Sequence, residues 1–254
     1  MNEDLVREPV SAPPRLAVDG LCFDLSDEDW ADFALQRTEP LIAMRAGDAL
    51  GRWFADGDRT AIISFLRRPR VTESFARMVV QAVDRELAEL QRHLDFSKIR
   101  RLASIGPGLG IFELKLYRMQ PCRLYLIDIE HSDEHRHGFH RSGSGYSSNA
   151  TARAFLEENG VPASDLAFCN PRTQPLDHSQ VDLILSNISM GFHYPVDDYV
   201  PYITSALPLG GTLVFDKRKG VADAGWDTLA PKFHERAALD FEKYRKLICE
   251  RRLP

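Results

Sequence analysis

The chain has 254 residues and a formal net charge of −5 at pH 7, with 44% hydrophobic and 27% charged residues. This composition is ordinary for a globular protein, and the acidic balance excludes a basic surface that coats nucleic acid. The first nine residues are polar, and no run approaches the roughly 18 apolar residues that span a bilayer. We therefore expect no secretory signal, no membrane contact and a cytoplasmic location. The four cysteines form no C-x-x-C pair and are expected to be reduced thiols.

Residues 1–97 carry helical signals and almost no strand signals. Ser26 precedes three acidic residues, as expected for a helix N-cap followed by an acidic first turn. The clearest helix spans Thr72–Leu94, where Thr72 can serve as the cap and apolar residues recur at steps of three and four. Its apolar face has to be buried, so we expect 1–97 to form a helical extension that packs on the next domain. That position is compatible with a substrate cap.

From 98 to 254, short apolar runs alternate with helical stretches, which predicts an α/β domain with a parallel, doubly wound sheet. A closing hairpin is expected at the end of the chain. The expected strands are Leu102–Ile105, Arg123–Asp128, Leu166–Asn170, Val181–Ser186 and Gly211–Phe215, with Ala237–Phe241 and Tyr244–Glu250 in the hairpin. The expected helices are Ile111–Arg118, Ser148–Asn159, Val196–Leu207 and Thr228–Phe233.

Three glycines, Gly106, Gly108 and Gly110, lie between the first of these strands and the following helix. Glycines there let the backbone approach a ligand closely, at the edge of the sheet where such folds bind ligands. A dinucleotide site would place its third glycine at position 111, which is Ile111. Asp128 ends the second strand, where a carboxylate can accept both hydroxyls of a ribose. The loop and the acid together indicate a nucleoside-containing ligand.

The ordered set of motifs resembles class I S-adenosylmethionine-dependent methyltransferases. It comprises the G-x-G-x-G loop, Asp128, Asn170 at the end of the third strand, the fourth strand within 181–187, and the Gly-Gly turn before the fifth strand within 209–214. The resemblance covers about residues 98–251. It implies a Rossmann-like, mostly parallel seven-stranded sheet and S-adenosyl-L-methionine as cofactor.

The resemblance also implies roles for individual residues. Asn170 stands where such enzymes contact the adenine edge, and Ser186 ends the strand that emerges beside the methyl donor. Ser104 stands where the family usually has an acid that orients the cofactor, and we include it among the cofactor-binding candidates. The missing acid leaves open a weakened, alternative or lost cofactor site.

The acceptor side is expected in the loop after the fourth strand. His193 is the candidate general base, because neutral imidazole is available near pH 7 and an unactivated alcohol needs a base within hydrogen-bond reach. Tyr194 either orients the acceptor or packs on Pro195. Together with Gly138–Phe139 after the second strand, this segment resembles bacterial sugar O-methyltransferases.

The stretch His131–His140 is rich in imidazole and carboxylate groups. Its spacing matches no metal signature, so we expect no metal ion and treat the stretch as a polar flap. His137 or His140 then becomes a candidate contact for the acceptor.

These observations predict methyl transfer from S-adenosyl-L-methionine to a hydroxyl of a small molecule, a sugar or a specialised metabolite. The expected partner is this acceptor, with no nucleic acid and no membrane; a homodimer is compatible with the sequence. Three alternatives remain: N-methyl transfer, a non-catalytic binding protein on a methyltransferase fold, which Ser104 supports, and a dinucleotide-dependent oxidoreductase, which Ile111 opposes.

Overall fold

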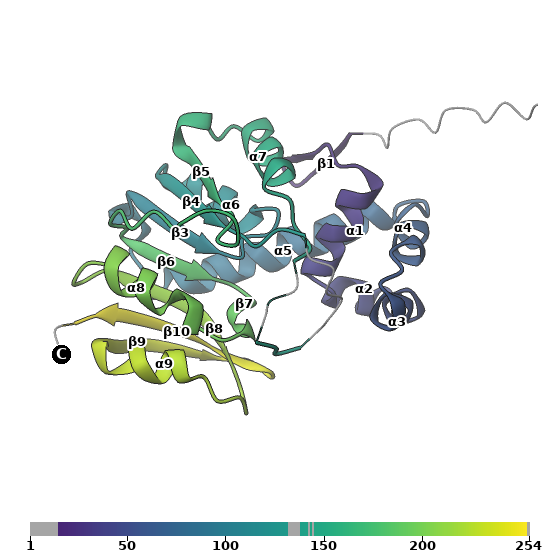
Figure 1. Cartoon of the computed structure of the whole chain (residues 1–254). Coiled ribbons are helices and arrows are strands. Elements are labelled where there is room, and N and C mark those ends of the chain that lie inside the picture. Colours follow the sequence, from purple (N-terminus) through teal and green to yellow (C-terminus); the bar gives the residue numbers. More distant parts are fainter. Residues whose placement is uncertain (1–14, 132–137, 142, 144, 253–254) are drawn as a thin grey trace, which may run out of the picture.

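A seven-stranded sheet organises the chain in the computed structural model, which describes residues 15–131, 138–141, 143 and 145–252 (Figure 1). The strand order is β5-β4-β3-β6-β8-β10-β9. The first five strands in that order run parallel, whereas β10 is antiparallel to both of its neighbours. The strands are β3 (Arg101–Ile105), β4 (Arg123–Ile127), β5 (Leu166–Cys169), β6 (Leu183–Ser186), β8 (Thr212–Arg218), β9 (Phe233–Asp240) and β10 (Tyr244–Arg251).

This arrangement confirms the predicted α/β, doubly wound, mostly parallel sheet and its closing hairpin. The chain leaves β3 in one direction to form β4 and β5, and later returns on the other side of β3 to form β6 and β8. The strand order therefore reverses between β3 and β6. A crevice forms at such a reversal beyond the carboxyl ends of the strands, where open α/β sheets bind their ligands.

Two hydrophobic clusters cover the two faces of the sheet. Successive side chains of a strand point to opposite faces, and Leu102 and Ala103 of β3 accordingly belong to different clusters. The first cluster also contains residues of α6 (Ile111–Met119) and α7 (Asn149–Glu158), and the second contains residues of α8 (Val200–Ala206) and α9 (Ala224–Leu229). Helices on both faces give the Rossmann-like layering.

From residue 15 to the sheet, the described part of the chain forms a small hairpin and five α-helices. The first four α-helices gather on the side of the molecule away from β9 and β10, whereas the fifth passes behind the sheet (Figure 1). Their apolar residues belong to the same cluster as one face of the sheet. The elements are β1 (Leu16–Val18), β2 (Leu21–Phe23), α1 (Asp27–Gln36), α2 (Glu39–Ala43), α3 (Gly47–Asp56), α4 (Thr60–Leu66) and α5 (Val71–Gln91).

Helix starts in this segment were predicted with mixed success. Ser26 caps α1 as expected, with a reciprocal capping box to Asp29. The expected cap at Thr72 is wrong: α5 begins at Val71, and the Thr72 hydroxyl donates instead to the Leu66 carbonyl at 2.6 Å. The β1–β2 hairpin was missed because its strands are only three residues long.

Two further expectations need correction. The segment after β6, expected as a loop, contains strand β7 (Ser189–Tyr194), which lies against β8. Gly191 permits this approach, since a Cβ there would lie 2.7 Å from the Phe215 ring. The last helix begins at Ala224 and ends at Leu229, rather than spanning 228–233, because Asp223 caps it through the Trp226 amide.

None of the helices in the described ranges is both long enough and apolar enough to cross a membrane.

Candidate active site

A cavity of about 110 Å³ lies at the carboxyl ends of the central strands, where the strand order reverses. Its wall is made of the loop between β3 and α6, the end of β4, the segment from Asn187 into β7, and the end of α1. Most of the residues predicted from the sequence line this one cavity: Gly106, Gly108, Gly110, Asp128, His193 and Tyr194.

The glycine loop requires glycine for two reasons. Gly106, Gly108 and Gly110 have φ angles of +70°, +59° and +85°, in the left-handed region that side chains disfavour. Neighbouring groups also approach closely: a Cβ on Gly106 would lie 1.9 Å from the Ser189 hydroxyl, and one on Gly108 would lie 2.3 Å from the Gln36 amide oxygen. The loop therefore has no room for larger residues at these two positions.

Asp128 lines the cavity with a carboxylate that backbone amides hold in place. Its Oδ1 accepts a hydrogen bond from the Glu130 amide at 3.0 Å, and its Oδ2 accepts one from the Gly108 amide at 3.3 Å. Burial raises the pKa of Asp128, although these hydrogen bonds oppose that rise. Each carboxylate oxygen has a second lone pair, which leaves Asp128 able to accept hydrogen bonds from a diol.

Ser104 is buried beneath the glycine loop, and a carboxylate from the next helix lies beside it. The Ser104 hydroxyl donates to Oε1 of Glu113 at 2.5 Å. Glu113 is 2% exposed, lines the cavity, and has no hydrogen-bond partner for Oε2 within the described ranges. Burial raises the pKa of Glu113 to about 7. A buried carboxylate of α6 therefore lies beside the position where the acid is absent.

Gln36, the last residue of α1, lies directly on the glycine loop. Its Oε1 accepts a hydrogen bond from the Leu109 amide at 2.9 Å, and its Nε2 donates to the Tyr146 carbonyl at 2.8 Å. The next residue, Arg37, also lines the cavity and forms two hydrogen bonds with Glu86 of α5, at 2.6 and 3.0 Å. The first helices of the chain therefore form part of the cavity wall.

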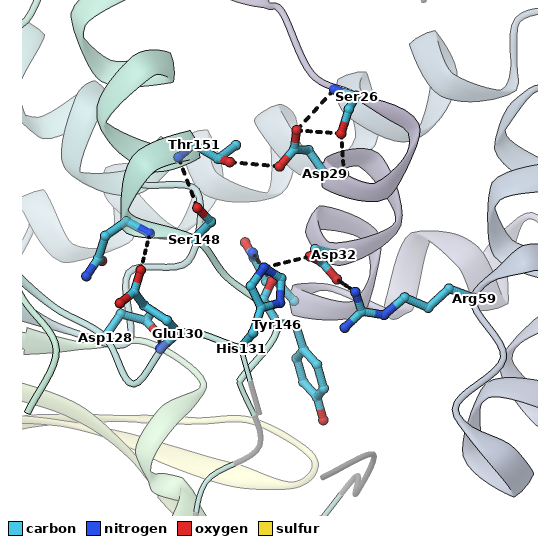
Figure 2. A network of polar contacts seen from close by, with 12 residues as sticks. Ser26, Asp29, Asp32, Arg59, Asp128, Glu130, His131, Tyr146, Ser148 and Thr151 are labelled. Carbon is cyan, nitrogen blue, oxygen red and sulfur yellow. Dashed lines mark hydrogen bonds and ion pairs between the residues drawn. The ribbon is translucent and has the colours of Figure 1, made fainter. Parts of the chain in front are cut away.

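Polar contacts also tie α1 to the segment that follows β4 (Figure 2). Asp32 lies between Arg59 and His131, with nitrogen–oxygen distances of 2.8 and 3.5 Å. Burial raises the pKa of Asp32 to about 6, although Arg59 opposes this rise. Asp29, one turn earlier on α1, accepts a hydrogen bond from the Thr151 hydroxyl of α7 at 2.7 Å. These contacts hold α1 against the segment that follows β4 and against the N-terminal turn of α7.

His193 and Tyr194 reach the cavity from β7. Nδ1 of His193 lies 3.1 Å from the carbonyl oxygen of Gly138, which can only accept a hydrogen bond. The hydrogen of a neutral imidazole is therefore on Nδ1, and its lone pair is on Nε2, the nitrogen that can take a proton. The Tyr194 hydroxyl is hydrogen-bonded to Ser189 at 2.7 Å, and burial raises its pKa.

Ser186 and Asn170 lie outside the cavity wall. The Ser186 side chain is fully buried, where it donates to the Ile105 carbonyl at 2.9 Å and accepts from the Met190 amide at 2.9 Å. Asn170 donates to Glu130 at 2.9 Å and thereby holds the segment after β4. Their roles in cofactor binding stay predictions.

The histidine-rich stretch 131–140 lies partly outside the described residues, because these exclude 132–137, and with them His137. His140 is described, and its backbone amide donates to the His193 carbonyl at 2.8 Å. Over the ranges that the structure covers, no group of three or more histidine, cysteine or acidic side chains is placed to hold a metal ion.

Several residues of this site were missed from the sequence: Gln36, Arg37, Glu113 and Asn187. Gln36 and Arg37 lie at the end of α1 and Glu113 lies in α6, outside the predicted motifs, whereas Asn187 ends the fourth-strand motif but was not predicted to have a role in the site. The signal that could have indicated Glu113 is an acidic residue between Phe112 and Leu114, in a first helical turn that is otherwise apolar. No comparable local signal marks Gln36.

Solved structures share this fold, whereas no protein-family model and no curated protein sequence matches the chain. StiE O-MT residues 961–1257 aligns with 73% of this chain and 78% of its own, at 14% identity and a TM-score of 0.52. An O-methyltransferase family protein from Burkholderia thailandensis aligns with 74% of this chain and 62% of its own, at 12% identity and a TM-score of 0.48. An RNA methyltransferase from Salinibacter ruber, solved with S-adenosyl-L-homocysteine, aligns with 68% and 94%, at 18% identity and a TM-score of 0.42.

The chain has the class I methyltransferase fold. In this methyltransferase fold, the cavity offers the groups that a sulfonium nucleoside requires. Asp128 can accept hydrogen bonds from a ribose, and the glycine loop leaves space beside the backbone. Oε2 of Glu113, which has no partner among the residues that the structure describes, can accept from an ammonium group. The residues present therefore fit S-adenosyl-L-methionine.

Proposed function

We propose that the chain transfers the methyl group of S-adenosyl-L-methionine to a hydroxyl oxygen of a small molecule. The observation that carries this proposal is the single cavity shared by the glycine loop, Asp128 and His193 at the reversal of the strand order. The first two groups suit a nucleoside cofactor, and the third suits a proton acceptor. The methyltransferase fold supports the reaction class.

The cofactor supplies a methyl group on a positively charged sulfur. Held by the glycine loop and Asp128, it would offer the acceptor oxygen an electrophilic methyl carbon, with S-adenosyl-L-homocysteine as the leaving group. Nε2 of His193 takes the hydroxyl proton, while the hydrogen bond from Nδ1 to Gly138 holds the ring in the required tautomer. In-line displacement depends largely on positioning, so the residues that fix both reactants contribute most of the rate.

The helices before residue 98 act as a cap in this proposal. The cavity of about 110 Å³ is smaller than the roughly 300–1,000 Å³ of pockets that hold drug-sized ligands. Gln36 occupies the space above Gly108, where an added Cβ would collide with it. Cofactor entry therefore requires α1 to move away from the glycine loop, and its return covers the reactants.

Titration calorimetry with S-adenosyl-L-homocysteine tests the cofactor site. Asp128→Ala removes charge-assisted hydrogen bonds worth about 1.5–3 kcal/mol, so affinity should fall roughly ten- to a hundredfold. Asp240→Ala is the matched control, because Asp240 lies on edge strand β9 and pairs only with Lys219 in the described part of the chain. Unchanged affinity in Asp128→Ala would contradict the ribose assignment alone, whereas a wild type that binds no S-adenosyl-L-homocysteine would contradict the cofactor.

A further inference from the structure

Asn187 lies directly after β6, and its side-chain amide lines the cavity. The oxygen and the nitrogen of this amide differ in their hydrogen bonding. Its oxygen, Oδ1, accepts a hydrogen bond from Nζ of Lys246 at 2.6 Å. Its nitrogen, Nδ2, is buried and has no hydrogen-bond partner among the residues that the structure describes. An amide nitrogen carries two hydrogens and can only donate. The cavity wall therefore contains a buried donor that no group in the described ranges satisfies.

Lys246 fixes the orientation of this amide. An ammonium group can only donate, so the amide oxygen has to face it, and the nitrogen has to face away. Lys246 and Asp216 are 2% and 0% exposed and form an ion pair at 2.7 Å. Asp216 also accepts a hydrogen bond from the Ile188 amide at 2.9 Å. The ion pair thus holds both the Asn187 side chain and the backbone that follows it.

A buried donor without a partner is costly, and a ligand oxygen can satisfy it. A hydroxyl oxygen has two lone pairs, of which one can attack the methyl carbon while the other accepts a hydrogen bond. The nitrogen of a primary amine has one lone pair, and it is used in the attack. Such an amine can offer the Asn187 nitrogen only further hydrogens.

We propose that Asn187 determines the acceptor atom: its Nδ2 donates a hydrogen bond to the hydroxyl oxygen that receives the methyl group, and it disfavours amines. This inference rests on the proposed function, because it presupposes a methyl acceptor in the cavity. His193 then takes the proton of the acceptor hydroxyl, and Asn187 donates a hydrogen bond to its oxygen. Lys246 is a positioning residue that acts through the amide.

The test uses full-length protein saturated with S-adenosyl-L-homocysteine and two matched sets of probes, observed by ligand-detected NMR. One set contains benzyl alcohol and cyclohexanol, and the other contains benzylamine and cyclohexylamine. Wild type should bind the alcohols about tenfold more tightly than the amines, the ratio expected for one hydrogen bond gained or lost. At neutral pH the amines are ammonium ions, whose nitrogen has no lone pair left to accept a hydrogen bond from Asn187. Asn187→Asp keeps an oxygen for Lys246 but replaces the donor with an acceptor, so it should bring the ratio to one or below.

A double variant tests the role of the ion pair. Asp216→Asn with Lys246→Met removes both buried charges together and keeps an acceptor for the Ile188 amide, which avoids an unpaired buried charge. The amide is then free to rotate, and the preference for alcohols should fall severalfold at an unchanged melting temperature. A wild type that binds both sets alike, or binds neither, overturns the inference, as does an Asn187→Asp ratio equal to that of wild type. Loss of S-adenosyl-L-homocysteine binding by the wild type is the separate failure of the proposed function.

Discussion

The proposed cofactor side and the proposed acceptor side of the cavity are built from the chain in different ways. The glycine loop and Asp128 belong to one β-α-β unit, in which β3 and β4 are adjacent and parallel. The proposed acceptor side combines Asn187 after β6 and His193 of β7, with Lys246 of β10 hydrogen-bonded to Asn187. One side is specified by short-range spacing and the other by contacts between distant elements.

This difference makes the acceptor side the more informative target for mutation. On the cofactor side, backbone conformation provides much of the site, because the glycines shape the loop and the Asp128 oxygens accept from backbone amides. On the acceptor side, individual side chains provide the chemistry. Substitutions there should separate binding from turnover, which substitutions in the glycine loop cannot do.

The largest effect is expected at His193. A positioned base contributes typically about 10²–10⁴-fold, so His193→Ala should lower turnover of a hydroxyl acceptor by that order while leaving cofactor affinity nearly unchanged. His193→Asn should behave alike, because its amide cannot take the proton. Single-turnover rates should be measured beside melting temperatures. A destabilised variant with a normal rate per folded molecule would assign His193 a structural role, and His140 would be the next candidate.

An effect on stability is expected at Glu113, the carboxylate that replaces the missing acid. Its pKa of about 7 in the folded protein lies above the ordinary value of 4.5 because the group is buried. The stability that this group contributes is fully present below pH 4.5 and is lost as the pH rises through 7. A shift of this size corresponds to roughly 3 kcal/mol. The free energy of unfolding of Glu113→Gln, relative to that of wild type, should therefore increase between pH 5 and pH 8.

Denaturant unfolding at several pH values provides the measurement for Glu113→Gln. The matched control is Glu157→Gln, because Glu157 is exposed on α7 and pairs with Arg153 at 3.6 Å. That control should run parallel to wild type across the pH range. If the Glu113→Gln curve also runs parallel, the carboxyl is already ionised in the folded protein, and it cannot be the buried acid that we describe.

The sequence was sufficient for the sheet and for the cofactor side because both depend on local patterns. Alternation of apolar runs with helical stretches predicted a parallel, doubly wound sheet, and G-x-G-x-G predicted a loop whose glycines have positive φ angles. Ser104 is instructive. Serine in place of the usual acid left open a weakened, alternative or lost cofactor site, and the structure places Oε1 of Glu113 2.5 Å from the Ser104 hydroxyl. That compensation depends on how α6 packs against β3, which residue spacing alone does not reveal.

The smallest effect is expected at Gln36, and it tests whether α1 gates the cavity. Gln36→Ala removes the hydrogen bonds to the Leu109 amide and the Tyr146 carbonyl, which together hold α1 on the glycine loop. A neutral hydrogen bond contributes about 0.5–1.5 kcal/mol, so the association rate of S-adenosyl-L-homocysteine should rise about two- to tenfold if α1 has to open first. Gln91→Ala, on the exposed end of α5, is the matched control and should leave the rate unchanged.

Stopped-flow fluorescence can follow this step, because the Trp53 ring lies 5.2 Å from the ring of Tyr146, whose carbonyl Gln36 binds. Faster association with a similar increase in dissociation would show that Gln36 stabilises the closed arrangement without contributing to affinity. Slower dissociation is not expected, because the variant gains no contact with the ligand. An unchanged association rate would mean that the cofactor enters without moving α1. The helices before residue 98 would then shape the cavity without opening it.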